Sequence, residues 1–280
     1  MLQQTRVGAV ITKYGEFLRD FPKVEHLARA PQPAVLAAWS GLGYYRRARS
    51  MHLAAQQIVS EHEVRFPQTA EEWQKLPGIG RYTAAAIASI TRDEKVAVVD
   101  GNVERVTERL LGRRLATPEV WAFAEDLLSP ERPGDFNQAM MELGATICVP
   151  GEPKCSECPV ARWCGTRGKL ADVPKQQRTT KATVFYALDC AQGKVRLAQR
   201  SSEATVMPSM WELPLLTRDP DEARVFLRLK HSIMETNYDV GVVRAPVQRN
   251  TGKRIPVADL GEVPLTGLAR KILRAAEILR

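Results

Sequence analysis

Several classes of protein are excluded by what this sequence lacks. It contains no run of 18 apolar residues that could cross a bilayer, and its first twenty residues lack the basic and then apolar pattern of an export signal. Only five of its 280 residues are Cys, too few for a disulfide scaffold in a chain of this length. An apolar fraction of 44% is too high for a disordered chain. We therefore expect a folded protein without a membrane partner.

Acidic residues are in the minority. Lys and Arg together number 40 and Asp and Glu 32, so the formal net charge is +8. Such an excess favours an acidic partner such as nucleic acid, although charge alone does not specify one. The length is typical of two domains rather than one.

Hydrophobic periodicity predicts helices through the first two-thirds of the chain. Apolar residues recur at helical spacing within residues 7–18, 51–58, 103–110, 120–128 and 136–147. Thr69 and Glu72 have the spacing of a capping box, and Asp100 is placed to cap the helix after it. Since no segment here has the pattern of a strand, we predict an all-α domain.

The composition changes after Cys164. Residues 165–181 are rich in Gly and in Lys and Arg, which predicts a linker that is suited to lie along phosphates. Residues 182–188 and 194–198 then flank a Gln192-Gly193 turn, which predicts a hairpin that has Cys190 in its core. A further strand over 238–243 and a helix opened by 264–266 make the last third a separate α+β domain.

Four of the five cysteines lie within 17 residues. Cys148, Cys155, Cys158 and Cys164 have the spacing C-x6-C-x2-C-x5-C, so the short spacers bring four thiolates around one centre. Zinc accepts four thiolates, but structural zinc sites usually pair two close C-x2–4-C knuckles, and only one is present here. The unequal spacers favour a wider [4Fe-4S] cluster.

The cysteine spacing resembles that of the iron–sulfur helix–hairpin–helix DNA glycosylases, and neighbouring motifs agree with it. Residues 76–84, LPGIGRYTA, resemble the helix–hairpin–helix of this superfamily, in which Gly78 and Gly80 let backbone N–H groups approach a phosphate. Members that also nick the strand carry a Lys where this chain has Tyr82, which cannot form a Schiff base. The segments MLQQT, GLGYYRR, VDGNV and FNQA resemble the MutY family of adenine DNA glycosylases, which remove adenine mispaired with 8-oxoguanine or guanine.

The resemblance assigns the catalytic roles. It implies that Asp100 is the carboxylate that stabilises the oxocarbenium charge on the sugar, with Asn102 and Tyr82 completing the polar site beside it. Gln138 matches the residue that hydrogen-bonds the flipped adenine. In isolation these residues are typical of a helix cap, of packing and of a solvated helix face.

The resemblance also implies a set of DNA contacts. Tyr44 matches the intercalating aromatic and Gln4 the polar wedge, while Leu2 and Leu42 are expected beside the opposite base and Thr5 at the DNA. Without the family context, Tyr44 would be interpreted as a half-buried packing residue. The cluster Arg46, Arg47 and Arg49 is interpreted either as phosphate-facing or as a solvated helix face.

One catalytic residue of the family has no counterpart. The family's general-acid Glu lies three residues before the Leu that matches Leu2, and so would fall upstream of Met1. We expect that the native reading frame extends upstream and that the family's first helix is missing. The chain as written is then expected to release adenine slowly at best.

The C-terminal domain resembles the Nudix-like module with which the MutY family reads 8-oxoguanine. The match includes residues 207–214, MPSMWELP, but no Glu-rich hydrolase box is present. The lesion-reading Phe-Ser-His of the family aligns with Ile233-Met234-Glu235, and Met234 cannot donate the hydroxyl hydrogen bond. Discrimination between 8-oxoguanine and guanine is therefore expected to differ.

The prediction is an all-α helix–hairpin–helix glycosylase domain with a [4Fe-4S] loop (residues 1–168), a basic linker (169–181) and an α+β Nudix-like lesion-recognition domain (182–280). Its expected partner is double-stranded DNA with A:8-oxoG or A:G mispairs, and the chain is expected to be a cytoplasmic, nucleoid-associated monomer. Two alternatives remain: a non-catalytic lesion-binding protein on the same scaffold, and an endonuclease III-like lyase, which Tyr82 disfavours.

Overall fold

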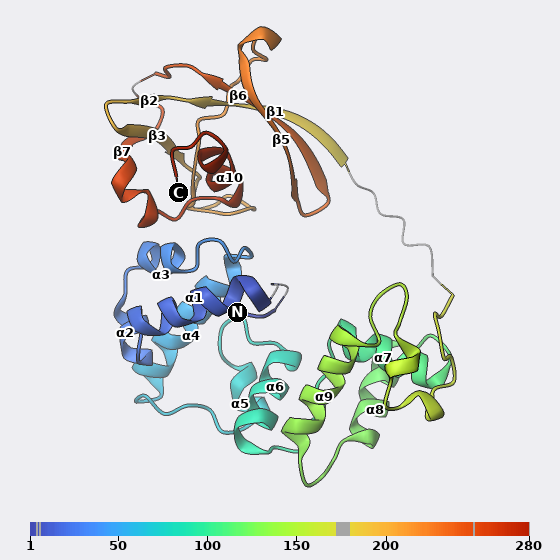
Figure 1. The fold of residues 1–280 in the computed structure, drawn as a ribbon. Helices are drawn as coiled ribbons and strands as arrows, with labels where there is room; N and C mark the ends of the chain where they lie inside the picture. Colours follow the sequence, from blue (N-terminus) through green and yellow to red (C-terminus); the bar gives the residue numbers. More distant parts are fainter. Residues whose placement is uncertain (4, 6, 172–179, 249, 280) are drawn as a thin grey trace. The chain divides into compact units, whose positions relative to one another are not determined.

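A computed structural model describes residues 1–3, 5, 7–171, 180–248 and 250–279 (Figure 1). The chain divides into two compact units, Glu61–Lys175 and Met1–Ser60 with Gln176–Arg280. Helices follow one another up to Thr146, and strands begin at Thr180. This confirms the predicted change from an all-α part to a part that contains strands. The two units nevertheless group the chain differently from the expected domain boundaries at residues 168 and 181.

The unit Glu61–Lys175 is helical, and its helices begin where the sequence provides caps. Thr69 and Glu72 form the predicted capping box, and the Asp100 side chain accepts hydrogen bonds from the first turn of the helix that follows it. Pro133 occupies the first turn of the last helix, where its missing N–H costs nothing. The helices are α5 (Ala70–Gln74), α6 (Arg81–Arg92), α7 (Gly101–Leu111), α8 (Thr117–Leu127) and α9 (Pro133–Thr146), followed by short 3-10 turns at Cys155–Glu157 and Ala161–Trp163.

The first sixty residues form a smaller helical layer around Trp39. The Trp39 side chain is buried together with Val35 and Leu36, and the Phe17 ring meets it edge-on at 6.0 Å. Its helices are α1 (Val7–Asp20), α2 (Val24–Arg29), α3 (Gln32–Ala38) and α4 (Arg46–Glu61). As predicted, α1 begins at Val7 and ends before Pro22.

Within the ranges that the structure describes, the C-terminal part contains two sheets and one α-helix, α10 (Gly267–Ala275), which Thr266 caps. In one sheet β6 (Thr236–Arg244) lies between β1 (Thr180–Leu188), which is parallel to it, and the antiparallel β5 (Val225–Ile233). In the other, β3 (Lys194–Gln199) pairs with β2 (Cys190–Ala191), β4 (Trp211–Glu212) and β7 (Lys253–Pro256). Leucine and valine side chains from the strands and from α10 form the core.

The predicted hairpin turn at Gln192-Gly193 is confirmed, but the predictions for its first arm and for Cys190 are wrong. The Gln192-Gly193 turn joins β2 to β3, whereas the strand over 182–188 pairs with β6 instead of folding back onto β3. Both turn residues have positive φ, at 52° and 68°, which fits a tight turn between two very short partners. Cys190 is exposed on β2 rather than buried in the core, because a two-residue strand at the sheet edge has little to cover it.

The early helices and the C-terminal part share one unit through specific contacts. The Tyr45 hydroxyl donates to the Leu265 carbonyl at 3.1 Å, and Arg270 donates to the Ser40 hydroxyl at 2.5 Å. Met210 is completely buried in the apolar cluster of α1–α4. Among the described residues, no helix is both long and apolar enough to cross a membrane.

Candidate functional site

The glycine turn between α5 and α6 leaves backbone donors open. Gly78 has φ of +75°, in the left-handed region, and Gly80 caps α6 without a side-chain hydrogen bond to the first turn. Both glycines are exposed, and a Cβ added at Gly80 would meet open space. The first N–H groups of this 12-residue helix can therefore donate hydrogen bonds to an anion.

Asp100 is held rigidly at the start of α7. Its Oδ1 accepts hydrogen bonds from the backbone N–H groups of Asn102 and Val103, both at 2.8 Å, and its Oδ2 accepts from the Asn102 amide at 3.1 Å. The carboxylate is only partly buried. The cap therefore holds the Asp100 carboxylate in one orientation at the start of α7.

Tyr82 lies in the first turn of α6 within the electrostatic reach of Asp100. Burial raises the pKa of the Tyr82 phenol above its ordinary value, and the negative charge of Asp100 raises it further. Its hydroxyl donates to the Met141 sulfur at 3.6 Å. Tyr82 is therefore a neutral hydrogen-bond donor at physiological pH, as the sequence suggested for a polar site around Asp100 and Asn102.

Gln138 lies on the exposed side of α9. Its amide donates to the Gly134 carbonyl at 3.4 Å, one turn back. Its neighbour Asn137 is buried and points the other way, toward the segment that leads into Asp100. α9 thus carries both the predicted adenine contact and a residue of the site's support.

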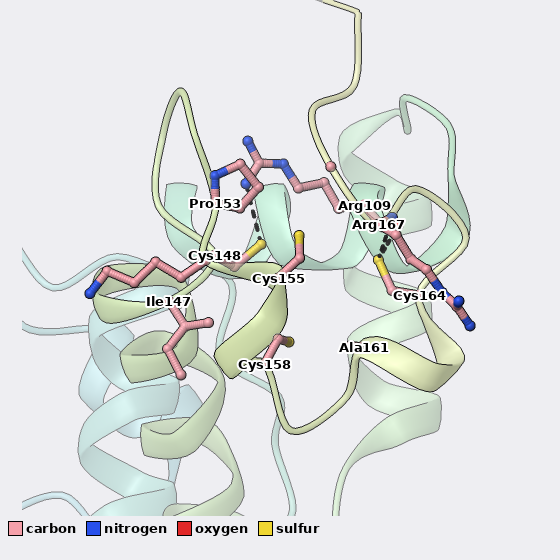
Figure 2. Close-up of a pocket in the computed structure, with 11 residues that line it drawn as sticks. Arg109, Ile147, Cys148, Pro153, Cys155, Cys158, Ala161, Cys164 and Arg167 are labelled. Atoms are coloured by element: carbon pink, nitrogen blue, oxygen red, sulfur yellow. Dashed lines mark hydrogen bonds between the residues drawn. The ribbon is translucent and has the colours of Figure 1, made fainter.

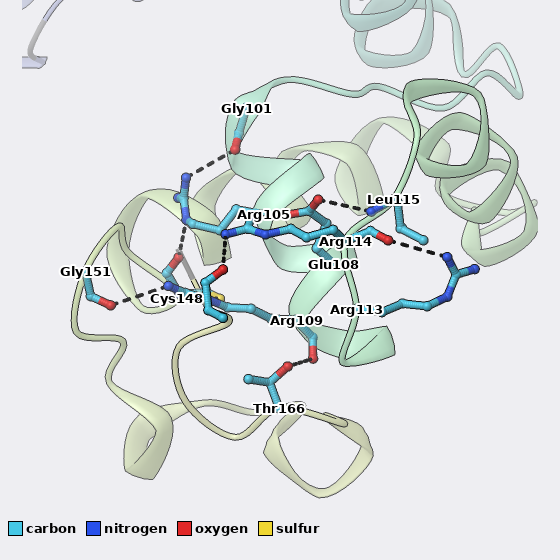
Figure 3. Close-up of polar contacts among 11 residues, drawn as sticks. Gly101, Arg105, Glu108, Arg109, Arg113, Arg114, Leu115, Cys148, Gly151 and Thr166 are labelled. Atoms are coloured by element: carbon cyan, nitrogen blue, oxygen red, sulfur yellow. Dashed lines mark hydrogen bonds and ion pairs between the residues drawn. The ribbon is translucent and has the colours of Figure 1, made fainter. Parts of the chain in front are cut away.

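Two arginines of α7, Arg105 and Arg109, contact the cysteine loop (Figure 3). Arg105 donates to the Asn102 side-chain oxygen at 2.8 Å, to the Cys148 carbonyl at 2.8 Å and to the Gly144 carbonyl at 2.6 Å. No motif in the sequence pointed to Arg105 as a site residue. The signal that could have found it is its position on the helix that Asp100 caps, three residues after Asn102.

Arg109 lies one turn further along the same helix and contacts the cysteine loop itself. It is 6% exposed, and its guanidinium donates to the Cys148 sulfur at 3.4 Å and to the Val149 carbonyl at 2.9 Å. Asp100, Asn102, Arg105 and Cys148 therefore form one continuous hydrogen-bonded chain.

The four clustered cysteines line a single cavity (Figure 2). Burial raises the pKa of the Cys155 thiol, and the nearby thiols of Cys164, Cys148 and Cys158 raise it further. The Cys164 sulfur accepts from the Arg167 N–H at 3.3 Å. Among the described residues no three His, Cys, Asp or Glu side chains converge closely enough to hold one ion. Four thiols that line one cavity are nevertheless a donor set that an iron–sulfur cluster accepts.

The residues of the first sixty that were predicted to contact DNA differ in how far they are exposed. Leu2 and Tyr44 are each 60% exposed, and Tyr44 has φ of +48°, a strained conformation for a non-glycine residue. Leu42 is only 4% exposed, so the structure packs this side chain in the core. Thr5 donates to the Leu42 carbonyl at 3.3 Å. The prediction for Gln4 lies outside the described residues.

The arginine cluster after Tyr44 is mostly structural. Arg47 is half-buried, donates to the Thr5 hydroxyl at 2.8 Å and lies over the Tyr44 ring at 5.6 Å. It also donates to the carbonyls of Met1 and Gly43. Arg47 thus links Met1 and Thr5 to the Gly41–Tyr44 loop by hydrogen bonds and supports the position of the exposed Tyr44 ring.

Comparison with known proteins finds relatives for the helical part of the chain. Residues 1–126 match the family model of the HhH-GPD superfamily base excision DNA repair protein. The adenine DNA glycosylase of Mus musculus is 47% identical over 62% of this chain and 36% of its own length, and that of Homo sapiens is 46% identical over 61% and 32%. The chain thus spans about a third of the length of these relatives.

Solved structures agree on the fold. A thermostable thymine-DNA glycosylase matches with a TM-score of 0.56 and 28% identity, over 59% of this chain and 79% of that one. Endonuclease III in a non-covalent DNA complex matches with a TM-score of 0.53 at 23% identity, over 59% and 78% of the two chains. Residues 1–126 are thus similar to the HhH-GPD superfamily of base excision DNA repair proteins, and about three fifths of the chain is similar to adenine DNA glycosylases.

Proposed function

We propose that this protein removes adenine from mispairs with 8-oxoguanine or guanine in double-stranded DNA by hydrolysing the N-glycosidic bond. The observation that carries the proposal is the capped Asp100 carboxylate beside Asn102 and Tyr82, in a chain of which 62% aligns at 47% identity with an adenine DNA glycosylase. The adenine must leave the base stack to reach such a site.

The chemistry follows from the arrangement of these side chains. As the bond between C1′ of the sugar and the adenine breaks, positive charge develops on the sugar, and a fixed carboxylate stabilises it without having to reorganise. A water oxygen then bonds to C1′, and the departing adenine takes up a proton. Asn102 holds the carboxylate, Tyr82 and Asn102 supply polar contacts to the sugar, and Gln138 contacts the extruded base.

We assign binding of the duplex to two places in the helical region, the start of α6 and the loop that carries Tyr44. The open N–H groups at the start of α6, after Gly78 and Gly80, are suited to a backbone phosphate. The exposed Tyr44 ring on a strained loop is suited to fill the gap that an extruded base leaves. Leu2 is proposed to lie beside the opposite base.

A [4Fe-4S] cluster is proposed for the cysteine cavity, held by Cys148, Cys155, Cys158 and Cys164. When bound it supplies rigid cross-links between the ends of the loop rather than redox chemistry of the reaction. Arg109 balances its negative charge, and Arg105 ties the loop to Asn102. Iron and sulfide analysis of purified protein distinguishes it from zinc.

The C-terminal part is proposed to be a Nudix-like domain that reads the base opposite adenine through the tip of the β5–β6 hairpin. Supporting this, the tip residues Ile233, Met234 and Glu235 join two strands that extend beyond the core, and Met234 is 86% exposed. Their chemistry departs from that of the resembling family, so we propose a weaker preference for 8-oxoguanine over guanine.

Single-turnover release of adenine tests the proposal. Duplexes that contain A opposite 8-oxoguanine, A opposite guanine and A opposite thymine are each incubated with excess protein, and free adenine and duplex affinity are measured. Slow release from both mispairs and none from the A:T pair is expected. Preferential binding without release would favour the non-catalytic lesion-binding protein, and borohydride trapping on abasic DNA would indicate a lyase.

A further inference from the structure

One face of α9 contacts every element of the Asp100 site in the unit Glu61–Lys175. Gly134, Asn137, Met141 and Gly144 follow at intervals of three and four residues, so they lie on one side of the helix. A Cβ on Gly134 would come within 2.5 Å of the Ser89 carbonyl oxygen, and one on Gly144 within 2.6 Å of the Asn102 Cβ. The two glycines therefore let α9 lie directly against α6 and the start of α7.

Between the two glycines, the Asn137 side chain takes the place of a neighbouring strand. Asn137 is 2% exposed. Its Oδ1 accepts from the Val98 N–H at 3.0 Å, and its Nδ2 donates to the Val96 carbonyl at 2.9 Å. In an extended chain, the carbonyl of one residue and the N–H two residues later point to the same side. One amide therefore satisfies both groups.

The segment that Asn137 binds leads directly into Asp100. Residues 93–100 join α6 to α7 without regular secondary structure, and Val98 is 1% exposed. Buried backbone groups without a partner are costly, so the segment needs a donor and an acceptor from outside. Asp100 follows Val98 by two residues, so a shift at Val98 moves the carboxylate.

We propose that Asn137 is a positioning residue for Asp100, which fixes the carboxylate by clamping Val96 and Val98 from α9. The proposal rests on the proposed function. Met141, one turn later on the same face, contacts the Tyr82 hydroxyl, and Gly144 contacts Asn102. α9 thus aligns three polar groups of the site on one rigid surface, while the neighbouring Gln138 faces outward to the base.

The test separates positioning from folding by comparing three variants. Asn137→Ala removes the clamp. Asn137→Asp keeps an acceptor for Val98 but loses the donor to Val96. Ser89→Ala is the matched control, because it removes the third hydrogen bond of Asn137, from Nδ2 to the Ser89 hydroxyl at 3.0 Å, and leaves the two bonds to the segment intact.

The readouts are the single-turnover rate of adenine release, the affinity for a mispaired duplex and hydrogen exchange over residues 96–100, all on the full chain well below its melting temperature. Asn137→Ala is expected to slow release by roughly ten- to a hundredfold while duplex affinity changes less than about threefold. Asn137→Asp is expected to lie between Asn137→Ala and wild type, and Ser89→Ala close to wild type. Exchange at Val98 rises in Asn137→Ala alone.

A wild-type rate in Asn137→Ala, or an equal loss in Ser89→Ala, overturns the proposal. If Asn137→Ala does not fold, Asn137→Asp decides, since a rate equal to that of wild type contradicts the clamp. If the wild-type chain releases no adenine, the proposed function fails, but exchange at Val98 still tests the clamp.

Discussion

Asp100 and the tip of the β5–β6 hairpin are the two regions that we expect to act on the two bases of a mispair, and the fold supports them differently. The Asp100 carboxylate accepts three hydrogen bonds, and Arg105 holds the partner amide of Asn102. Met234 at the hairpin tip is 86% exposed with φ of +53°. A carboxylate that is already fixed stabilises charge without reorganisation, whereas an exposed tip must be ordered by its ligand. Chemistry and recognition should therefore respond to mutation on different scales.

The largest effect is expected at Asp100 itself. Asp100→Asn removes the negative charge that faces the sugar but leaves a residue that caps a helix equally well. We expect adenine release to slow by about a thousandfold and the melting temperature to change by less than about 2 °C. Single-turnover kinetics and thermal unfolding measure the two quantities on the same preparation. Unchanged release by a folded Asp100→Asn protein would remove Asp100 from the mechanism.

An intermediate effect is expected at Arg105, which touches neither substrate nor Asp100. Arg105→Met keeps the apolar stem but removes the hydrogen bonds to Asn102, Gly144 and Cys148. We expect release to slow by roughly ten- to a hundredfold and iron content to fall, because the loop loses its link to α7. The matched control is Arg113→Met, which breaks an exposed ion pair with Glu119 and an exposed hydrogen bond to the Arg114 carbonyl and should change neither quantity. Equal effects in the two variants would contradict the link.

The difference between these two residues also shows where sequence reasoning succeeds. The cap at Asp100 follows from an Asp directly before a periodic helix, and the capping box at Thr69 from a four-residue spacing, so local patterns predict both. The contacts of Arg105 with Gly144 and Cys148 join residues about forty positions apart. No local pattern encodes them, because they depend on how closely α9 packs on α7.

The same limit explains the errors in the C-terminal part. The strand over 182–188 was expected to pair with its sequence neighbour, but a parallel partner more than fifty residues away, β6, satisfies its backbone instead. Leu42 similarly matches a DNA contact by motif, yet it is buried among the helices of the first sixty residues. The types of side chain along a segment predict whether it forms a helix or a strand, whereas tertiary packing decides its partners and which of its side chains are buried.

A smaller effect, on specificity rather than rate, is expected at the hairpin tip. Met234→Ser supplies the hydroxyl that the thioether lacks, and a single added hydrogen bond of about 1 kcal/mol corresponds to a roughly fivefold gain in preference for A:8-oxoG over A:G. Release from the preferred mispair should stay within about twofold. Met234→Ala serves as the control, since it shortens the side chain without adding a donor. A loss of rate as large as that of Asp100→Asn would abolish the contrast between the two regions.

The smallest effect concerns the strand that carries the tip. Burial lowers the pKa of His231 on β5, and the positive charge of Lys271 on α10 lowers it further. The unfolded chain therefore binds this proton more readily than the folded chain, so the folded state loses stability as the pH falls through the unfolded pKa of about 6.5. His231→Gln should reduce the drop in melting temperature between about pH 7.5 and pH 5.5 by no more than about 2 °C. His26→Gln, at an exposed position on α2, is the control and should match the wild type. If both variants keep the wild-type pH dependence, His231 does not keep its buried position near Lys271. The β5–β6 hairpin is then less well supported than its contacts indicate.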